Sequence, residues 1–299
     1  MRPTFIFALL LWLATPAVAG RDTYPFFISV ETESPHQNIV ARNGGPAPVT
    51  VCLSLPKAEN VATSLALPVQ AVIRPYDATV LLQVRPANPA RTLNFTSESA
   101  FHPGNLFARH DPQARYRLPF PEGDTFTIAQ AADGPLTTHA SLDSQNAVDF
   151  AMPEGTPVLA ARDGIVIETE SGFVRGGLDR QLESQANLIR ILHPDETIGT
   201  YAHLAPDGVL VQRGQRIQAG ELIGYSGATG YVAGPHLHFV VQTPISGRCP
   251  PVMRSLPIRF YVGEPPVVFE AKTRQRVTAD YRHPGVLPAV NEKRAIQAR

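Results

Sequence analysis

The stretch "GELIGYSGATGYVAGPHLHFVVQ" at residues 220–242 carries two histidines, one residue apart, at the start of a β-forming run. Side chains at positions i and i+2 of a strand point to the same face of a sheet. We therefore expect His236 and His238 to project side by side. A lone His-x-His pair is often structural, so its chemistry depends on what the rest of the chain places beside it.

The surrounding sequence predicts an all-β second half. "AVDFAMPEGTPVLAARDGIVI" (147–167) alternates strand-like and turn-like segments. "NLIRILHPDETIGTYAHL" (187–204) is typical of a hairpin whose turn is "HPDET", and "GELIGYSG" and "HLHFVVQT" are two further strands. The 29 prolines and 22 glycines of the chain also favour strands and loops over long helices.

The first half of the chain has a different sequence pattern. Between residues 21 and 118, short runs of β-branched and aromatic residues are separated by turn signals such as "RNGGPAP" (42–48) and "PKAEN" (56–60). Short strands at this spacing predict a β-sandwich of immunoglobulin-like architecture. The end of the chain is polar and contains prolines, so we expect a partly disordered tail with His283 exposed.

The N-terminus has the pattern of a secretory signal peptide. A single arginine, Arg2, precedes a short apolar stretch that ends in "AVA" before Gly20. The alternative is an uncleaved anchor, but the apolar stretch is short for a membrane span. We expect cleavage after Ala19 and an exported product in the periplasm or cell envelope, without stable membrane insertion. The expected organisation is a signal peptide at 1–19, a sandwich at 20–118, a second β-domain at 119–265 and a tail at 266–299.

The charge and the cysteine content of the chain argue against nucleic-acid binding and against a zinc site built on thiolates. The full chain has 26 Lys+Arg and 26 Asp+Glu, so removal of Arg2 with the signal leaves 25 against 26, a net charge of −1. Without a dense basic run, nucleic-acid binding is not expected. The two cysteines, Cys52 and Cys249, lie in different halves, and in an exported protein they either form a disulfide or remain buried thiols. The chain has no CxxC motif or Cys/His cluster, which excludes a zinc site built on thiolates.

Metal-type and acid–base side chains gather in strand-like settings of the second half. Catalytic zinc sites use three N/O protein ligands and leave the fourth position open for water. Asp149 lies inside the apolar strand "AVDF", where an acid is costly to bury unless it is paired or metal-bound. The alternatives are a salt bridge or turn cap for Asp149 and an ordinary core position for His203 in "TYAHL". We expect the isolated His36, His102 and His110 to be ordinary surface or packed histidines.

These motifs, in this order, closely resemble the lysostaphin/LytM-type zinc metallopeptidases over about residues 134–245. The resemblance implies a compact antiparallel β-sheet with a substrate groove and one zinc ion per chain. It assigns Asp149 and His238 as metal ligands, His236 as the catalytic histidine that acts as general base, and His203 as the second catalytic histidine. It also implies peptide substrates in peptidoglycan cross-links or stems.

One position departs from the commonest family pattern, which has a histidine ligand four residues before the aspartate. Gln145 stands there, and the nearest upstream histidine is His139. A neutral amide is a poor zinc ligand beside imidazole. Because "ASLDSQN" (140–146) is small and polar, it is suited to a turn that folds His139 back towards Asp149. We expect His139, Asp149 and His238 to bind the metal, with Asp143 as rival ligand or an incomplete site as the alternatives.

Three functions follow from these observations. The leading hypothesis is a zinc-dependent endopeptidase that hydrolyses peptide bonds in peptidoglycan. The first alternative is a non-catalytic LytM-like domain that binds cell wall or a partner hydrolase and regulates it. The second is a secreted carbohydrate-binding β-sandwich with incidental histidines, which would leave the order of the motifs unexplained.

Overall fold

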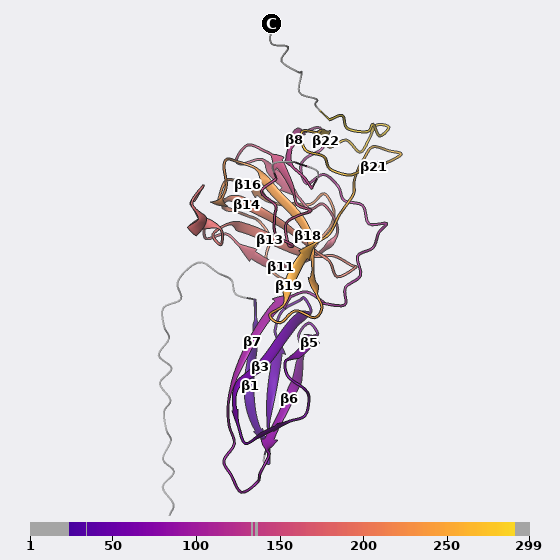
Figure 1. Ribbon diagram of the computed structural model, residues 1–299. Helices are drawn as coiled ribbons and strands as arrows, with labels where there is room; N and C mark the ends of the chain where they lie inside the picture. Colours follow the sequence, from indigo (N-terminus) through magenta and orange to yellow (C-terminus); the bar gives the residue numbers. More distant parts are fainter. Residues whose placement is uncertain (1–23, 34, 133, 135–136, 291–299) are drawn as a thin grey trace, which may run out of the picture.

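Alternating short strands and turns give this chain an almost entirely β architecture (Figure 1). The computed structural model describes residues 24–33, 35–132, 134 and 137–290, so the expected signal peptide lies outside the described residues. The 3₁₀ turn η1 (Arg180–Leu182) is the only helical segment within these ranges. No helix in this part of the chain is long and apolar enough to cross a membrane.

The first part of the chain forms two sheets that share one core (Figure 1). The order in one sheet is β1-β2-β6-β4 and in the other β5-β3-β7. Alternate residues point inwards, including Ile39 and Val84 from the first sheet and Val51 and Ile73 from the second. This is a seven-stranded sandwich, and its likeness to an immunoglobulin domain stays a prediction. The strands are β1 (Phe26–Glu33), β2 (His36–Asn43), β3 (Val49–Glu59), β4 (Val61–Thr63), β5 (Val69–Ile73), β6 (Ala78–Pro86) and β7 (Asn94–Pro103).

The second part is built on one large sheet with the order β15-β11-β13-β14-β18-β9-β8-β22, to which β10, β16 and β19 are joined. Two small ribbons, β12-β17 and β20-β21, lie outside it. The predicted hairpin is confirmed, since β13 and β14 pair antiparallel and His193 and Thr197 close the turn. The strands are β8 (Thr125–Gln130), β9 (Val148–Ala151), β10 (Pro157–Leu159), β11 (Gly164–Glu170), β12 (Gly176–Gly177), β13 (Asn187–Leu192), β14 (Ile198–Val209), β15 (Arg216–Ile217), β16 (Leu222–Ser226), β17 (Gly230–Tyr231), β18 (Leu237–Ile245), β19 (Val252–Ser255), β20 (Phe260–Val262), β21 (Val267–Phe269) and β22 (Arg276–Thr278).

One expected turn of the first half is part of a strand. "PKAEN" is not a turn, because β3 continues to Glu59 and pairs with β7. Pro56 falls where the β3–β7 register shifts between Ser54 and Lys57, a bulge position where a missing N–H is tolerated. Strand β7 was not anticipated, since its sequence "NFTSESAFHP" has few apolar residues.

The disorder expected at the polar end of the chain was also wrong for the segment that forms β22, and the expected tail at 266–299 contains β21 as well. Strand β22 pairs with β8 and covers an edge of the large sheet. Only one residue of this strand, Val277, is buried, together with the following Ala279. A strand that buries every second residue looks polar in composition, which explains the error. The core of the large sheet therefore extends from Ala114 to Ala279, beyond both ends of the expected 119–265 range.

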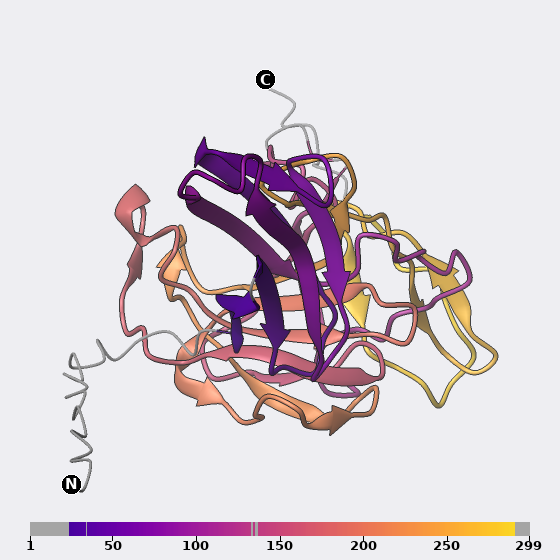
Figure 2. The same cartoon turned by 90° about the horizontal axis from the view of Figure 1, so that it is seen from below.

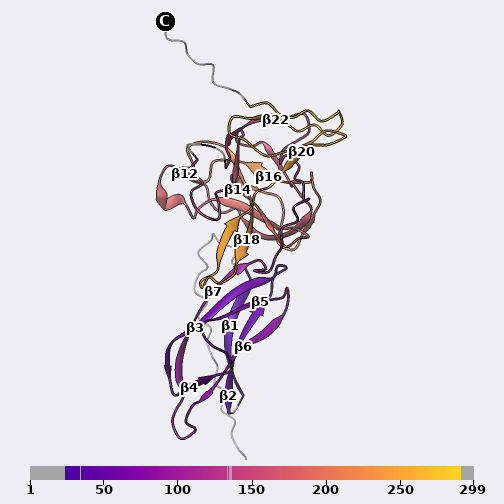
Figure 3. The same ribbon diagram turned by 45° about the vertical axis from the view of Figure 1, so that its right-hand side comes forward.

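The sandwich and the large sheet meet along a small apolar seam (Figures 2 and 3). Val49 of the sandwich packs in one cluster with Ile167, Ile198 and Met253 of the second part. Strands β18 and β19 extend towards the sandwich in Figure 3, and Gln70 Nε2 donates to the Arg248 carbonyl oxygen at 2.8 Å. The seam therefore covers part of one face of the large sheet.

A disulfide between Cys52 and Cys249 crosses this seam. It joins residues 197 positions apart, so it closes a long loop in the unfolded chain. Closing such a loop typically stabilises a fold by about 2–5 kcal/mol. We expect a Cys52→Ala/Cys249→Ala double variant to unfold at lower urea concentration, with its free energy of unfolding reduced by about that amount. Urea unfolding followed by circular dichroism measures this free energy.

Reduced wild-type protein is the matched control for the double variant. Reduction should lower the stability of the wild type and leave the double variant unchanged. Two alkylated thiols in the unreduced, denatured wild type would contradict the disulfide, as would equal urea midpoints for the oxidised wild type and the variant.

Candidate metal centre

Strand pairing brings Asp149 and His238 together. Asp149 in β9 lies directly opposite His238 in β18. Side chains of directly opposed residues share one face of the sheet. The His238 Nδ1 nitrogen lies 2.9 Å from Asp149 Oδ1. His236, just before the strand, lies further away, with its Nε2 3.8 Å from Asp149 Oδ2.

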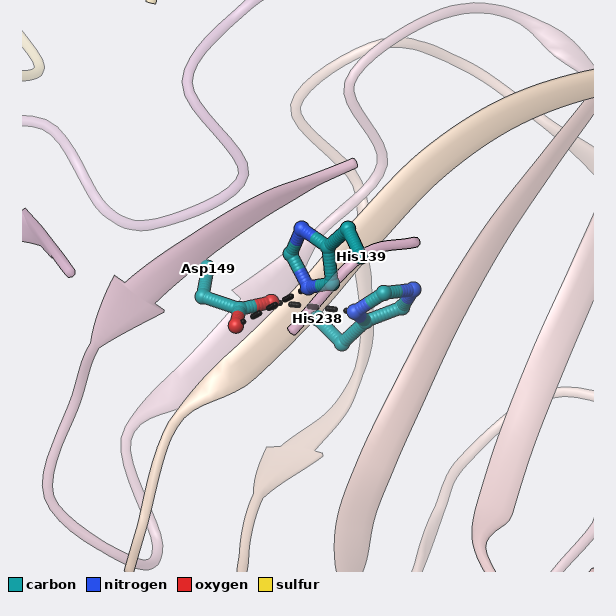
Figure 4. A group of neighbouring side chains, drawn as sticks. All are labelled: His139, Asp149 and His238. Atoms are coloured by element: carbon teal, nitrogen blue, oxygen red, sulfur yellow. Dashed lines mark hydrogen bonds and ion pairs between the residues drawn. The ribbon is translucent and has the colours of Figure 1, made fainter. Parts of the chain in front are cut away.

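His139 reaches the same carboxylate from the loop before β9 (Figure 4). Its Nε2 lies 3.2 Å from Asp149 Oδ2, and its side chain is buried. A turn between His139 and Asp149 reverses the chain direction. In this turn Ser144 and Gln145 donate their backbone N–H groups to the Ser141 carbonyl oxygen. Gln145 is exposed on this turn. The rival Asp143 is also exposed, and its carboxylate accepts a hydrogen bond from Ser141 Oγ.

The three side chains form a donor set that fits a metal ion. One ligand atom from each of His139, Asp149 and His238 lies within 4.8 Å of the others. Ligand atoms of a tetrahedral zinc site, with bonds of about 2.0–2.1 Å, are separated by roughly 3.3 Å. The two nitrogen–carboxylate distances of 3.2 and 2.9 Å are close to this value. Two imidazole nitrogens and a carboxylate are also the N/O ligand types of catalytic zinc sites.

The Asp149 carboxylate is held in its ionised form. Burial favours protonation of Asp149, but hydrogen bonds from His139 and His238 outweigh it and keep its pKa well below the usual range. Gln130 Nε2 donates a further hydrogen bond to Asp149 Oδ2 at 2.9 Å. An ionised, buried carboxylate between two imidazoles attracts a cation strongly.

A β-bulge turns His203 towards the same site. Ala202 pairs with Leu188 and Leu204 pairs with Asn187, so His203 is the extra residue on β14. Strict alternation would point His203 away from His238, because Ala202 is the residue opposite His238. His203 instead adopts a left-handed backbone with φ of 63°, which a non-glycine residue rarely does. Bulges of this kind re-aim a side chain.

His203 and His236 then face each other beside the donor set. Their ring centroids are 4.7 Å apart, and those of His203 and His238 are 5.8 Å apart. His203 Nδ1 lies 2.7 Å from the Thr229 carbonyl oxygen, and His236 Nδ1 lies 2.9 Å from that of Gly234. A carbonyl oxygen only accepts, so each Nδ1 is the N–H donor and each Nε2 of a neutral ring is left to accept a proton.

Burial keeps the His203 ring uncharged. Desolvation, followed by the nearby His238 and His236, lowers the pKa of His203 to about 3. The His203 ring is therefore neutral near pH 7. The His236 side chain is 16% exposed, so it is in partial contact with water.

Gln130 is a site residue that the sequence analysis missed. Its Oε1 accepts a hydrogen bond from the Thr138 N–H at 2.7 Å, while its Nε2 holds Asp149. It therefore links the residue before His139 to Asp149. Gln130 is the last residue of β8, and only the pairing of β8 with β9 puts it opposite Asp149.

We expect Gln130→Ala to weaken metal binding without abolishing it. Partners that orient metal ligands typically contribute about 10- to 100-fold in affinity. Competition with a chromophoric chelator measures the zinc dissociation constant, which should rise by about this factor. Gln113→Ala, on an exposed loop, is the control and should leave the constant unchanged. An unchanged constant in Gln130→Ala would exclude the linking role.

Residues 143–248 match the model of peptidase family M23. The chain contains an M23 peptidase domain. This family is one of metallopeptidases, so it implies a metal at the site. The matched range includes Asp149, His203, His236 and His238 but begins after His139, whose placement rests on the geometry alone.

Curated relatives are similar to part of this chain. The peptidoglycan DD-endopeptidase ShyA of Vibrio cholerae is 40% identical over 94 residues, which are 31% of this chain and 19% of the relative. The glycyl-glycine endopeptidase ALE-1 of Staphylococcus capitis is 37% identical over 110 residues, 37% of this chain and 28% of the relative. The chain thus spans less than a third of either relative's length.

A solved structure of lysostaphin from Staphylococcus simulans aligns at 29% identity. The alignment covers 40% of this chain and 42% of that chain, with a TM-score of 0.30. The family assignment therefore rests on the sequence match, and the all-β fold on the strand pairing described above.

Proposed function

We propose that this protein is a zinc-dependent endopeptidase that hydrolyses peptide bonds in peptidoglycan cross-links or stem peptides. The observation that carries the proposal is the donor set of His139, Asp149 and His238 with the facing pair His203 and His236 beside it. The M23 match and the endopeptidase names of the relatives support the reaction class. The names also support a place in the bacterial envelope, as the expected signal peptide does.

His139, Asp149 and His238 would hold the metal. When bound, zinc supplies a Lewis acid that polarises the peptide carbonyl and acidifies water. Both imidazole nitrogens that face Asp149 would exchange a proton for the metal, so binding is expected to weaken as pH falls.

The histidine pair handles the proton of the attacking water. His236 Nε2 is unprotonated in the neutral ring and is accessible, so it accepts this proton as general base. The oxygen of this water bonds to the carbonyl carbon, the peptide C–N bond breaks, and the same proton passes to the leaving amine. The neutral His203 ring, fixed by the Thr229 carbonyl oxygen, orients the reacting groups beside His236.

The rival function, a regulator without catalysis, is less well supported. Such a domain has no need to keep a complete donor set and a facing histidine pair. The strained φ of His203 supports catalysis further, because a strained backbone at such a position costs of order 1–3 kcal/mol without improving the fold.

Metal analysis of the purified protein, paired with a peptidoglycan digest, tests the proposal. We expect one zinc ion per chain and new amine ends in the digest. Treatment with a chelator should stop the reaction, and added zinc should restore it. Protein that carries zinc but releases no peptide amine from cross-linked peptidoglycan would favour the regulatory alternative.

A further inference from the structure

A cavity of about 390 Å³ lies between the sandwich and the large sheet. Its floor includes Glu168, Glu170, Leu188 and Arg190 of β11 and β13, and its sandwich wall includes Phe101 of β7. Because β7 belongs to the first part of the chain, this cavity exists only where the two parts are joined. The proposed catalytic steps do not use it.

A row of directly opposed residues on neighbouring strands connects the cavity floor to the metal centre. Residues directly opposite each other on neighbouring strands share a face. Following these pairs from β11 to β9 gives the row Glu170, Leu188, Ala202, His238 and Asp149. The Glu170 carboxylate and the metal centre therefore lie on the same face.

Strand spacing gives the separation along this row. Glu170 is three strands from His238, which at about 4.8 Å per strand is roughly 14 Å. An extended peptide rises about 3.3 Å per residue. A peptide whose scissile bond lies at the metal centre would therefore place in the cavity a side chain about four residues away.

The charges of the cavity leave one carboxylate available. Arg190 Nη1 pairs with Glu168 Oε2 at 2.7 Å, so these two charges offset each other. Among the described residues Glu170 forms no ion pair, and its Oε1 accepts only the backbone N–H groups of Ser171 and Gly172, both at 3.1 Å. Burial lowers the pKa of His102, the neighbour of Phe101 on the wall, so this histidine adds no positive charge near pH 7.

The apolar part of the lining suits an alkyl chain. Phe101 and Phe173 line the cavity together with Leu188. Aliphatic groups pack on such side chains, and an ammonium group is attracted both to aromatic faces and to a carboxylate. An aliphatic ammonium matches this combination better than a carboxylate or a neutral sugar, because the unpaired charge is negative.

We propose that this cavity is a subsite for a free aliphatic ammonium group carried by the peptide substrate, with Glu170 as its counter-charge. The proposal rests on the endopeptidase function proposed above. It gives the sandwich a direct part in substrate recognition, since β7 supplies one wall.

Acetylation of the substrate tests the subsite without knowledge of the scissile bond. Soluble cross-linked peptide fragments of peptidoglycan are used either with their free amines or after acetylation with acetic anhydride. The wild-type KM should be about tenfold higher for the acetylated fragments, the size expected for one lost charge-assisted contact. The value of kcat and the zinc content should change little.

Glu170→Gln should raise the KM for the free-amine fragments by about tenfold and should barely change the KM for the acetylated ones. Glu59→Gln, which removes an equal charge from an exposed end of β3, is the matched control and should behave as the wild type. Equal discrimination by Glu170→Gln and wild type would overturn the subsite.

Binding separates this proposal from the proposed function. If the zinc-loaded wild type cleaves neither fragment, the endopeptidase function fails, and calorimetry with the same fragments then tests the subsite alone. Tighter binding of the free-amine form, lost in Glu170→Gln, would uphold the subsite. Equal binding of both forms to the wild type would overturn it.

Discussion

His139→Ala should lose zinc and peptide hydrolysis together while keeping its fold. His139 contributes one of the three donor atoms of the site, and its Nε2 lies 3.2 Å from the Asp149 carboxylate. Removing a ligand should cost more than removing a partner that merely orients one, so we expect zinc affinity to fall by more than about 100-fold. Chelator competition and the digest measure the two losses on the same sample.

Gln145→Ala and Asp143→Ala are the matched controls for this prediction. Both residues are exposed on the turn between His139 and Asp149. Substitutions at exposed positions usually change stability by no more than about 0.5 kcal/mol, so zinc affinity should stay within about twofold of the wild type. A His139→Ala protein with full zinc and full hydrolysis would show that His139 is not a ligand. Loss of zinc in Asp143→Ala would make Asp143 the third ligand.

Most residues of the candidate site could be predicted from the sequence because their signals are local. The i, i+2 spacing of His236 and His238 and the acid inside the apolar "AVDF" strand are visible without knowledge of the sheet. The polar composition of residues 140–146 also predicted the turn that the structure has there. Strand alternation and turn chemistry depend on near neighbours in sequence, and such features can be read from one chain.

The features that escaped prediction depend on pairing between distant strands. The bulge at His203 exists only relative to β13, and Gln130 meets Asp149 only through the β8–β9 register. Strand β22 is a similar case, because Val277 is buried by β8, about 150 residues earlier in the chain. The cavity beside Glu170 needs the sandwich to be placed on the sheet, which no local pattern specifies.

The second large effect is expected for His236→Ala and His203→Ala. Each variant should lose most of its hydrolytic activity and keep its zinc bound. Neither residue belongs to the donor set, and both present a proton-accepting Nε2 beside it. Loss of a positioned acid–base group typically costs about 10²- to 10⁴-fold in rate. We therefore expect kcat to fall by this factor in each variant, with zinc stoichiometry unchanged by metal analysis. His238→Ala should instead lose the metal.

His283→Ala is the control for this pair, because His283 is 76% exposed and lies outside the site. It should keep both zinc and activity. His236 is the sharper of the two tests, since its Nε2 is only 3.8 Å from Asp149 Oδ2 and a modest movement would make it a ligand. If His236→Ala lost zinc while His238→Ala retained it, the roles assigned to His236 and His238 would be reversed. His238 would then be the general base, beside His203, whose ring is held in place by the Thr229 carbonyl oxygen.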